Sequence, residues 1–128
     1  MLDFKGNTAV YILYAYARIC SIMRRSELSQ NLDILDYNVI NLNHKSELLV
    51  ARYLVKFPEI INDIIGTLKL NILCDYLYNL ANAITIFHRD CKVLNQSNEE
   101  DRIKLIYATI LILRKGLNLL GIECPERI

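Results

Sequence analysis

Two kinds of side chain that can bind a nucleic acid alternate along one stretch near the start of the chain. Tyr11, Tyr14, Arg18, Ser21 and Arg25 are spaced so that all five fall on one face of a helix. Tyrosine rings can stack on bases, and guanidinium groups can neutralise phosphates. The same spacing is also typical of tyrosines at the margin of a protein core, with their hydroxyls in water. The pattern alone leaves both interpretations open.

The opposite face of this stretch is apolar, which predicts a core-facing helix over residues 9–25 after a short turn at Lys5 and Gly6. The residues that this helix is expected to bury are Ile12, Leu13, Tyr16, Ile19, Cys20 and Met23.

The composition indicates one all-helical domain. A chain of 128 residues can bury a sizeable core, and 53% of its residues are hydrophobic, with only 4 Gly and 2 Pro. Few turn residues and long periodic apolar runs predict an all-α protein, and we expect a five-helix bundle. Because the net charge is only +1, binding of a nucleic acid requires a local arrangement of cations rather than a global basic field.

Apolar periodicity predicts the other four helices and one irregular connection. Residues 26–43 lose the helical period, so we interpret them as a long connection with at most a short helical turn. The last helix is apolar nearly all round and is expected to be the central, most buried element. The four helices are predicted at roughly residues 44–57, 59–66, 70–93 and 98–120.

Several residues are expected to begin or end these helices. Asn43 is a candidate N-cap, and Gly66 is a candidate C-terminal glycine. Ser97 followed by Glu100 has the spacing of a capping box. His44, at the start of a helix, is expected to have a structural role.

The sequence offers no set of side chains for catalysis or metal binding. Its four cysteines are widely separated, which indicates reduced thiols of an intracellular protein, and with only two histidines we expect no zinc site. We find no glycine-rich phosphate loop and no nucleophile beside a base. No apolar run is long enough to span a membrane. His88, taken alone, is more typical of a histidine at the edge of the core than of a functional one.

The opening string LDFKGNTAVYILYAYARICSI resembles the start of the C-terminal anticodon-binding domain of arginyl-tRNA synthetases, often called the DALR domain. Further segments resemble the same family in the same order, so that the resemblance spans the chain. They are Phe57-Pro58-Glu59, the string YLYNLA from Tyr76, the string FHRDCKVL from Phe87, Arg102, the string GLNLLGI from Gly116, and Pro125-Glu126-Arg127-Ile128.

The resemblance implies a single domain, residues 1–128, that forms the C-terminal part of a longer synthetase. In the family this bundle holds the anticodon arm of arginine tRNA, and an upstream class I domain joins arginine to the tRNA with ATP and Mg²⁺. The HIGH and KMSK signatures of class I synthetases are absent from the chain, so it is expected to be inactive alone and to hold no cofactor itself. The implied partners are arginine tRNA and the catalytic domain of the same polypeptide, without DNA or a membrane. We expect a cytoplasmic monomer.

The resemblance also implies which residues contact the anticodon. The family's contacts come from the opening loop, the start of the first helix, the end of the fourth helix and the last residue. Lys5, Arg18 and Arg25 are chemically suited to phosphates. Every arginine codon has G in the middle, so the middle anticodon base to be read is C. The expected anticodon-binding residues are Asp3, Phe4, Lys5, Gly6, Asn7, Thr8, Tyr11, Tyr14, Arg18, His88, Arg127 and Ile128.

Two positions depart from the family pattern. The family usually ends in methionine, where this chain has Ile128, and it commonly has tyrosine where this chain has His88. An apolar side chain and an aromatic ring can still make the contacts expected there.

A second hypothesis comes from a different functional class. The near-neutral charge and high apolar content also fit a free-standing helical module for protein–protein interaction. That hypothesis predicts a contiguous exposed apolar patch. The tRNA hypothesis instead predicts that Tyr11, Tyr14, His88 and Ile128 lie together on one exposed surface.

Overall fold

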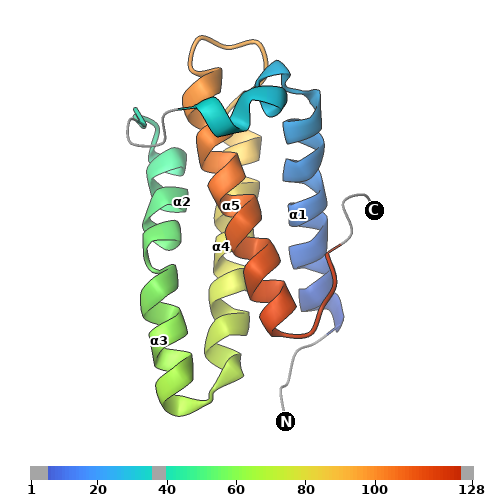
Figure 1. Cartoon of the computed structure of the whole chain (residues 1–128), viewed down its shortest axis with the longest axis vertical. Helices are drawn as coiled ribbons and strands as arrows, with labels where there is room; N and C mark the ends of the chain where they lie inside the picture. Colours follow the sequence, from blue (N-terminus) through green and yellow to red (C-terminus); the bar gives the residue numbers. More distant parts are fainter. Residues whose placement is uncertain (1–5, 36–39, 125–128) are drawn as a thin grey trace.

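The computed structural model describes residues 6–35 and 40–124 (Figure 1). Within these ranges the chain forms five α-helices and one 3-10 helix and contains no strand, which confirms the predicted all-α five-helix bundle. The elements are α1 (Gly6–Arg25), η1 (Glu27–Ile34), α2 (Lys45–Val55), α3 (Phe57–Thr67), α4 (Leu70–Asp90) and α5 (Glu99–Leu119).

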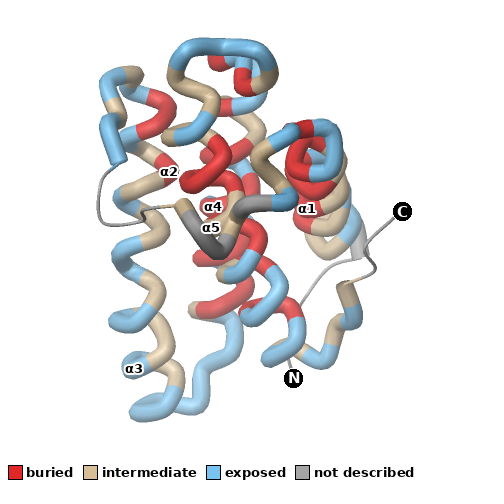
Figure 2. The backbone as a smooth tube through the Cα atoms, turned by 45° about the horizontal axis from the view of Figure 1, so that its top comes forward, coloured by how far each residue is buried: buried red, intermediate tan, exposed pale blue. Residues whose placement is uncertain are grey.

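The helix α4 is the central element of the bundle. It contacts each of the other four α-helices, whereas α5 contacts α1, α2 and α4 (Figure 1). The prediction that the last helix is central is therefore wrong. Its apolar sequence is not fully buried, because Leu111 and Leu119 face solvent. Figure 2 shows how the buried residues gather on the inner sides of α1, α4 and α5.

The apolar face of α1 packs into the core as its periodicity predicts. Of the six residues expected there, Leu13 is half-buried and the other five are buried. Tyr16 is fully buried, and its hydroxyl accepts a 3.0 Å hydrogen bond from Arg114 Nε of α5. Because this bond satisfies the buried hydroxyl, the aromatic ring can fill the core without an unpaired polar group.

The contact between α4 and α5 depends on a glycine. A Cβ atom built on Gly116 of α5 would lie 2.5 Å from Leu77 Cδ2, and both residues are buried. Only a residue without a side chain lets the two helices approach this closely.

The ends of α2 and α3 differ from the predicted ones. His44, not Asn43, is the N-cap of α2, since His44 Nδ1 accepts a 3.1 Å bond from the Ser46 N–H. The structural role expected for His44 is confirmed. α3 continues past Gly66 and ends at Leu68, which adopts a left-handed conformation with φ of 58° and donates its N–H to Ile64 O. The αL cap is thus formed by a leucine, two residues after the glycine expected there.

The carboxylate of Glu99 links the start of α5 to the connection after α1. The capping box of Ser97 and Glu100 is not formed, because Asn98 is the N-cap and makes no side-chain cap bond. Instead, the Glu99 carboxylate accepts bonds from the Asn95 N–H at 2.6 Å and from Ser26 Oγ at 2.7 Å. Ser26 also caps η1, an eight-residue 3-10 helix that is longer than the short turn expected in this connection.

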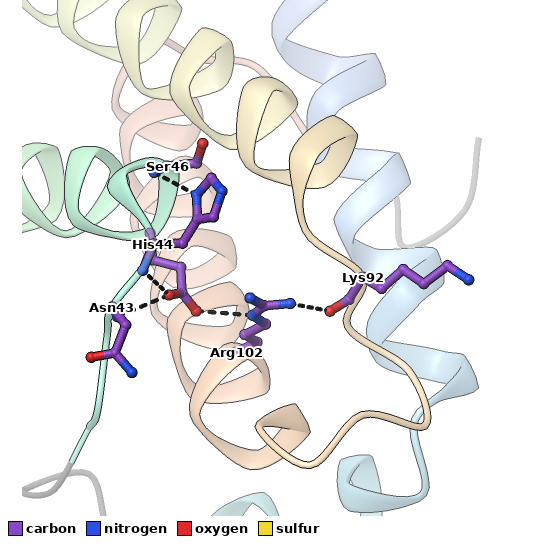
Figure 3. Close-up of polar contacts among 6 residues, drawn as sticks. Asn43, His44, Ser46, Lys92 and Arg102 are labelled. Carbon is purple, nitrogen blue, oxygen red and sulfur yellow. Dashed lines mark hydrogen bonds and ion pairs between the residues drawn. The ribbon is translucent and has the colours of Figure 1, made fainter.

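A buried ion pair joins α2, α5 and the segment that follows α4 (Figure 3). Arg102 Nε lies 2.9 Å from Glu47 Oε2, and Arg102 Nη1 donates to the carbonyl oxygen of Lys92. Glu47 also accepts bonds from the backbone N–H groups of His44 at 2.8 Å and Asn43 at 3.1 Å. This network fixes the position of the chain where α4 ends.

Two structural findings bear on possible functions. Within residues 6–35 and 40–124, none of the helices combines the length and apolar character needed to cross a bilayer. The same ranges hold no group of three or more His, Cys, Asp or Glu side chains placed to bind a metal ion. The four cysteines are free thiols.

Candidate nucleic-acid interface

The outer faces of α1 and α4 form one surface. The two helices lie side by side and run in the same direction, so their carboxyl ends meet at the same end of the bundle (Figure 1). The α1–α4 strip is the set of polar and aromatic residues on this surface. It consists of Tyr11, Tyr14, Arg18 and Arg25 of α1, together with Tyr78, Asn82 and His88 of α4.

The amino-terminal half of the strip is aromatic. The Tyr11 and Tyr78 rings have their centroids 5.3 Å apart at an interplanar angle of 42°, a tilted contact between the two helices. The Tyr11 hydroxyl donates a 3.2 Å bond to Asn82 Oδ1. Tyr78 is 43% exposed, and Tyr14, one turn along α1, is 58% exposed. The exposed rings of Tyr14 and Tyr78 therefore flank the Tyr11 ring, which α4 holds in place.

The carboxyl-terminal half of the strip is cationic. The pKa of His88 lies below its ordinary value because the ring is partly buried and because Arg18 and Arg25 are close enough to disfavour a further positive charge. Arg25 Nε makes only a 3.5 Å bond to Ser21 O of its own helix. No ion pair within the described ranges involves Arg18 or Arg25, so both guanidinium groups are available to an anion.

A pocket of about 360 Å³ opens beside His88, where the ends of α1 and α4 meet the α4–α5 connection. Its floor is apolar and its rim carries cationic and amide side chains. Such a combination suits a planar base with an attached phosphate. The lining residues are Ile22, Arg25, His88, Cys91, Lys92, Val93, Leu94, Asn95 and Gln96.

The roles of the predicted contact residues stay predictions, although the structure places several of these residues. Tyr11, Tyr14, Arg18 and His88 all belong to the α1–α4 strip. Gly6, Asn7 and Thr8 form the first turn of α1 rather than part of an opening loop. The remaining five residues, Asp3, Phe4, Lys5, Arg127 and Ile128, lie outside the described residues, and so does the expected proximity of Ile128 to Tyr11.

Sequence reasoning missed two residues of the strip, Tyr78 and Asn82. They are four residues apart and lie off the apolar seam of α4, so their spacing puts them on one outer face of that helix. This signal could have marked them as candidates. Their contact with Tyr11 could not be foreseen, because it depends on which helix packs beside α1 and at what height.

Exposed tyrosine rings beside guanidinium groups that make no ion pair within residues 6–35 and 40–124 are suited to a single-stranded nucleic acid. The model of the DALR anticodon binding domain matches residues 12–128, and the chain belongs to this family.

Relatives and solved structures agree with this assignment. The chloroplastic/mitochondrial arginine–tRNA ligase of Arabidopsis thaliana is 42% identical over 123 residues, which cover 95% of this chain and 19% of the relative. The arginine–tRNA ligase of Shewanella putrefaciens is 42% identical over 130 residues, covering 99% of this chain and 22% of the relative. The chain thus spans about a fifth of the length of these relatives.

Among solved structures, the arginyl-tRNA synthetase of Plasmodium falciparum superposes with a TM-score of 0.85 at 35% identity, covering 99% of this chain and 22% of that one. The Thermus thermophilus enzyme gives a TM-score of 0.76 at 25% identity, covering 98% of this chain and 22% of that one. The fold is therefore that of the corresponding segment of arginyl-tRNA synthetases.

Proposed function

We propose that this chain binds the anticodon arm of arginine tRNA and reads the cytosine in the middle of the anticodon. The observation that carries the proposal is the α1–α4 strip. Three tyrosine rings occupy one half of it, and two arginines and His88 occupy the other half; neither arginine forms an ion pair in the described ranges. The membership of the DALR family indicates which kind of nucleic acid the strip receives.

The strip supplies two different contributions to binding. A base stacked on an aromatic ring gains about 1–3 kcal/mol, largely independent of its sequence, and the exposed rings of Tyr14 and Tyr78 offer such surfaces. Arg18 and Arg25 attract the phosphates of the same nucleotides. From Tyr11 to Arg25 the strip runs about 21 Å along α1, at the usual rise of 1.5 Å per residue. It can therefore contact more than one nucleotide of a loop.

The wider activity follows from the relatives. They are arginine–tRNA ligases, and this chain matches about a fifth of their length. We propose that the chain serves such a ligase, in which a catalytic domain of the same polypeptide joins arginine to tRNA with ATP and Mg²⁺. We also propose that the protein is a monomer and acts in the cytoplasm, although one of the relatives above is organellar.

The alternative, a module for protein–protein contacts, has one observation in its favour. Ile65, Leu68 and Leu70, around the turn between α3 and α4, are exposed apolar side chains, and Leu68 is 84% exposed. We favour tRNA binding because the family match covers residues 12–128, which include all of α4 and most of α1.

The test is a titration of the chain with arginine tRNA and with the same tRNA carrying U in place of the middle anticodon C, at low and at moderate salt. The proposal predicts tighter binding to the C-bearing tRNA, and Tyr14→Ala should weaken it. Leu119→Ala is the matched control, since Leu119 is exposed on α5 outside the strip. Equal binding to both tRNAs that disappears with salt would reduce the function to charge attraction.

A further inference from the structure

The Tyr11 hydroxyl, in the aromatic half of the strip, is held in place by a residue of another helix. It belongs to α1, and its 3.2 Å bond to Asn82 Oδ1 crosses to α4. The Tyr78 ring lies against the Tyr11 ring at a centroid distance of 5.3 Å, which limits how far the side chain can swing away. The direction in which this hydroxyl points is therefore set by two residues of α4.

The bond to Asn82 also determines whether the Tyr11 hydroxyl can donate or accept a hydrogen bond with a ligand. A tyrosine hydroxyl has one proton to donate and lone pairs with which to accept. Asn82 Oδ1 is an acceptor, so the proton of Tyr11 is engaged by it. A ligand that approaches this hydroxyl consequently meets an acceptor, and it must bring a donor to make a hydrogen bond.

Cytosine and uracil differ in this respect. Cytosine carries an amino group at position 4, which donates, whereas uracil carries a carbonyl oxygen there, which accepts. A uracil in the same place would set two acceptors against each other, and a polar group left unpaired in a contact that excludes water is costly. A hydroxyl held as an acceptor therefore discriminates between two bases of nearly the same shape.

We propose that Asn82 is a positioning residue for base selection, which engages the proton of the Tyr11 hydroxyl so that this oxygen accepts the 4-amino group of the middle anticodon cytosine. This inference rests on the proposed function, because it takes the ligand to be an anticodon with C in the middle. Asn82 itself needs no contact with RNA in this arrangement. Tyr78 assists by holding the Tyr11 ring against α4.

The experiment measures the ratio of dissociation constants for the U-bearing and C-bearing arginine tRNAs in four variants. Asn82→Leu removes the acceptor and frees the proton of Tyr11, and Tyr11→Phe removes the hydroxyl. Each should lower the ratio roughly three- to tenfold, the factor expected for one lost hydrogen bond. The double variant should lower it no further than Tyr11→Phe alone, because the two residues act through one bond. Asn82→Asp keeps an acceptor and should keep the wild-type ratio, even if its charge weakens binding to both tRNAs.

Circular dichroism of each variant reports whether the bundle is intact. If Asn82→Leu fails to fold, Asn82→Ala takes its place, since it also removes the acceptor and suits an exposed helix position. The inference alone is overturned if Asn82→Leu keeps the wild-type ratio, if it weakens binding to both tRNAs equally, or if Asn82→Asp behaves like Asn82→Leu. A wild-type chain that does not distinguish the two tRNAs would overturn the proposed function and this inference together.

Discussion

Glu47 and Arg102 form an ion pair across 55 residues of sequence, with Arg102 Nε 2.9 Å from Glu47 Oε2. The Glu47 side chain is 2% exposed and the Arg102 side chain 13%. Both charged groups make further hydrogen bonds to the backbone. Glu47 accepts bonds from the N–H groups at the start of α2, and Arg102 donates a bond to the carbonyl of Lys92. The pair therefore joins two helices to the segment behind His88, and it connects the stability of the fold with the shape of the candidate site.

Removing one partner of this pair should be strongly destabilising. Glu47→Ala leaves the Arg102 guanidinium buried without its carboxylate and also deletes the acceptor at the start of α2. We expect the free energy of unfolding to fall by about 3–5 kcal/mol, the range measured for broken buried pairs. Chemical denaturation checks this, with Glu123→Ala as the control. Glu123 is exposed, and its removal should change stability by less than about 0.5 kcal/mol.

The same pair predicts acid sensitivity. Burial alone would raise the pKa of Glu47, but the bonds from His44, Arg102 and Asn43 outweigh it, so the pKa lies below its ordinary value. A carboxylate whose pKa is lower in the folded state stabilises the fold above its unfolded pKa, and this contribution is lost as the pH falls through the folded pKa. The unfolding free energy should therefore drop below about pH 4.5, near the ordinary pKa of Glu. Glu47→Gln should show a smaller drop over the same range when denaturation is repeated from pH 6 to pH 3.

Two glycines in helices should respond oppositely to the same substitution. Gly116→Ala puts a methyl group 2.5 Å from Leu77 Cδ2 in the core, so we expect a loss of about 1–3 kcal/mol from overpacking. Gly66→Ala meets no atom within 4 Å and lies inside α3, so it should raise stability by roughly 0.5–1 kcal/mol. Thermal melting of the two glycine variants checks both expectations. A stabilised Gly116→Ala would show that Leu77 can move aside.

The fold was largely predictable because it follows from local patterns. The period of Ile12, Tyr16 and Ile19 is sufficient to orient α1, and Pro58 correctly marks the start of α3. The errors at helix ends amount to a residue or two, because local signals do not define the exact terminal residue. Gly66 is a good helix terminator by type, yet α3 continues for one more residue, and Leu68 caps it.

The candidate site was predictable only in part, for a related reason. The face of α1 with Tyr11, Tyr14 and Arg18 follows from helical spacing. Its continuation onto α4 does not, because a sequence states neither which helix lies beside α1 nor at what height. The neighbours of Tyr11 on α4 therefore emerged only from the packed structure.

Salt dependence separates the two arginines of the strip from other surface cations. Each phosphate contact to a single strand contributes about 0.7 to the slope of log K against log salt concentration. Arg18→Ala and Arg25→Ala should each reduce this slope by roughly that amount and should weaken binding to the C-bearing and U-bearing tRNAs alike. Lys115→Ala, on the exposed part of α5, should leave the slope unchanged. An unchanged slope in Arg18→Ala would remove that residue from the interface.

His88 should make tRNA binding depend on pH. Its pKa is lowered by partial burial and by Arg18 and Arg25 of α1, so the ring is neutral at pH 7 and gains its proton only below about pH 6.5, the ordinary value. The other charged residues near it are Arg89 and Asp90, which pair with each other, and Lys92 on the rim of the same pocket. Binding of a phosphate offsets the repulsion from these cations, and it therefore favours the protonated ring.

The expected result is that the affinity for arginine tRNA rises as the pH falls from 7.5 to 5.5, and that His88→Gln flattens this rise. Glutamine keeps a polar side chain at the position but cannot gain a proton in that range. His44 is the other histidine of the chain and caps α2 away from the strip, so His44→Asn, which preserves an N-cap, is the matched control and should keep the pH dependence. An affinity that rises equally in His88→Gln would place the responsible proton elsewhere, on the protein or on the RNA.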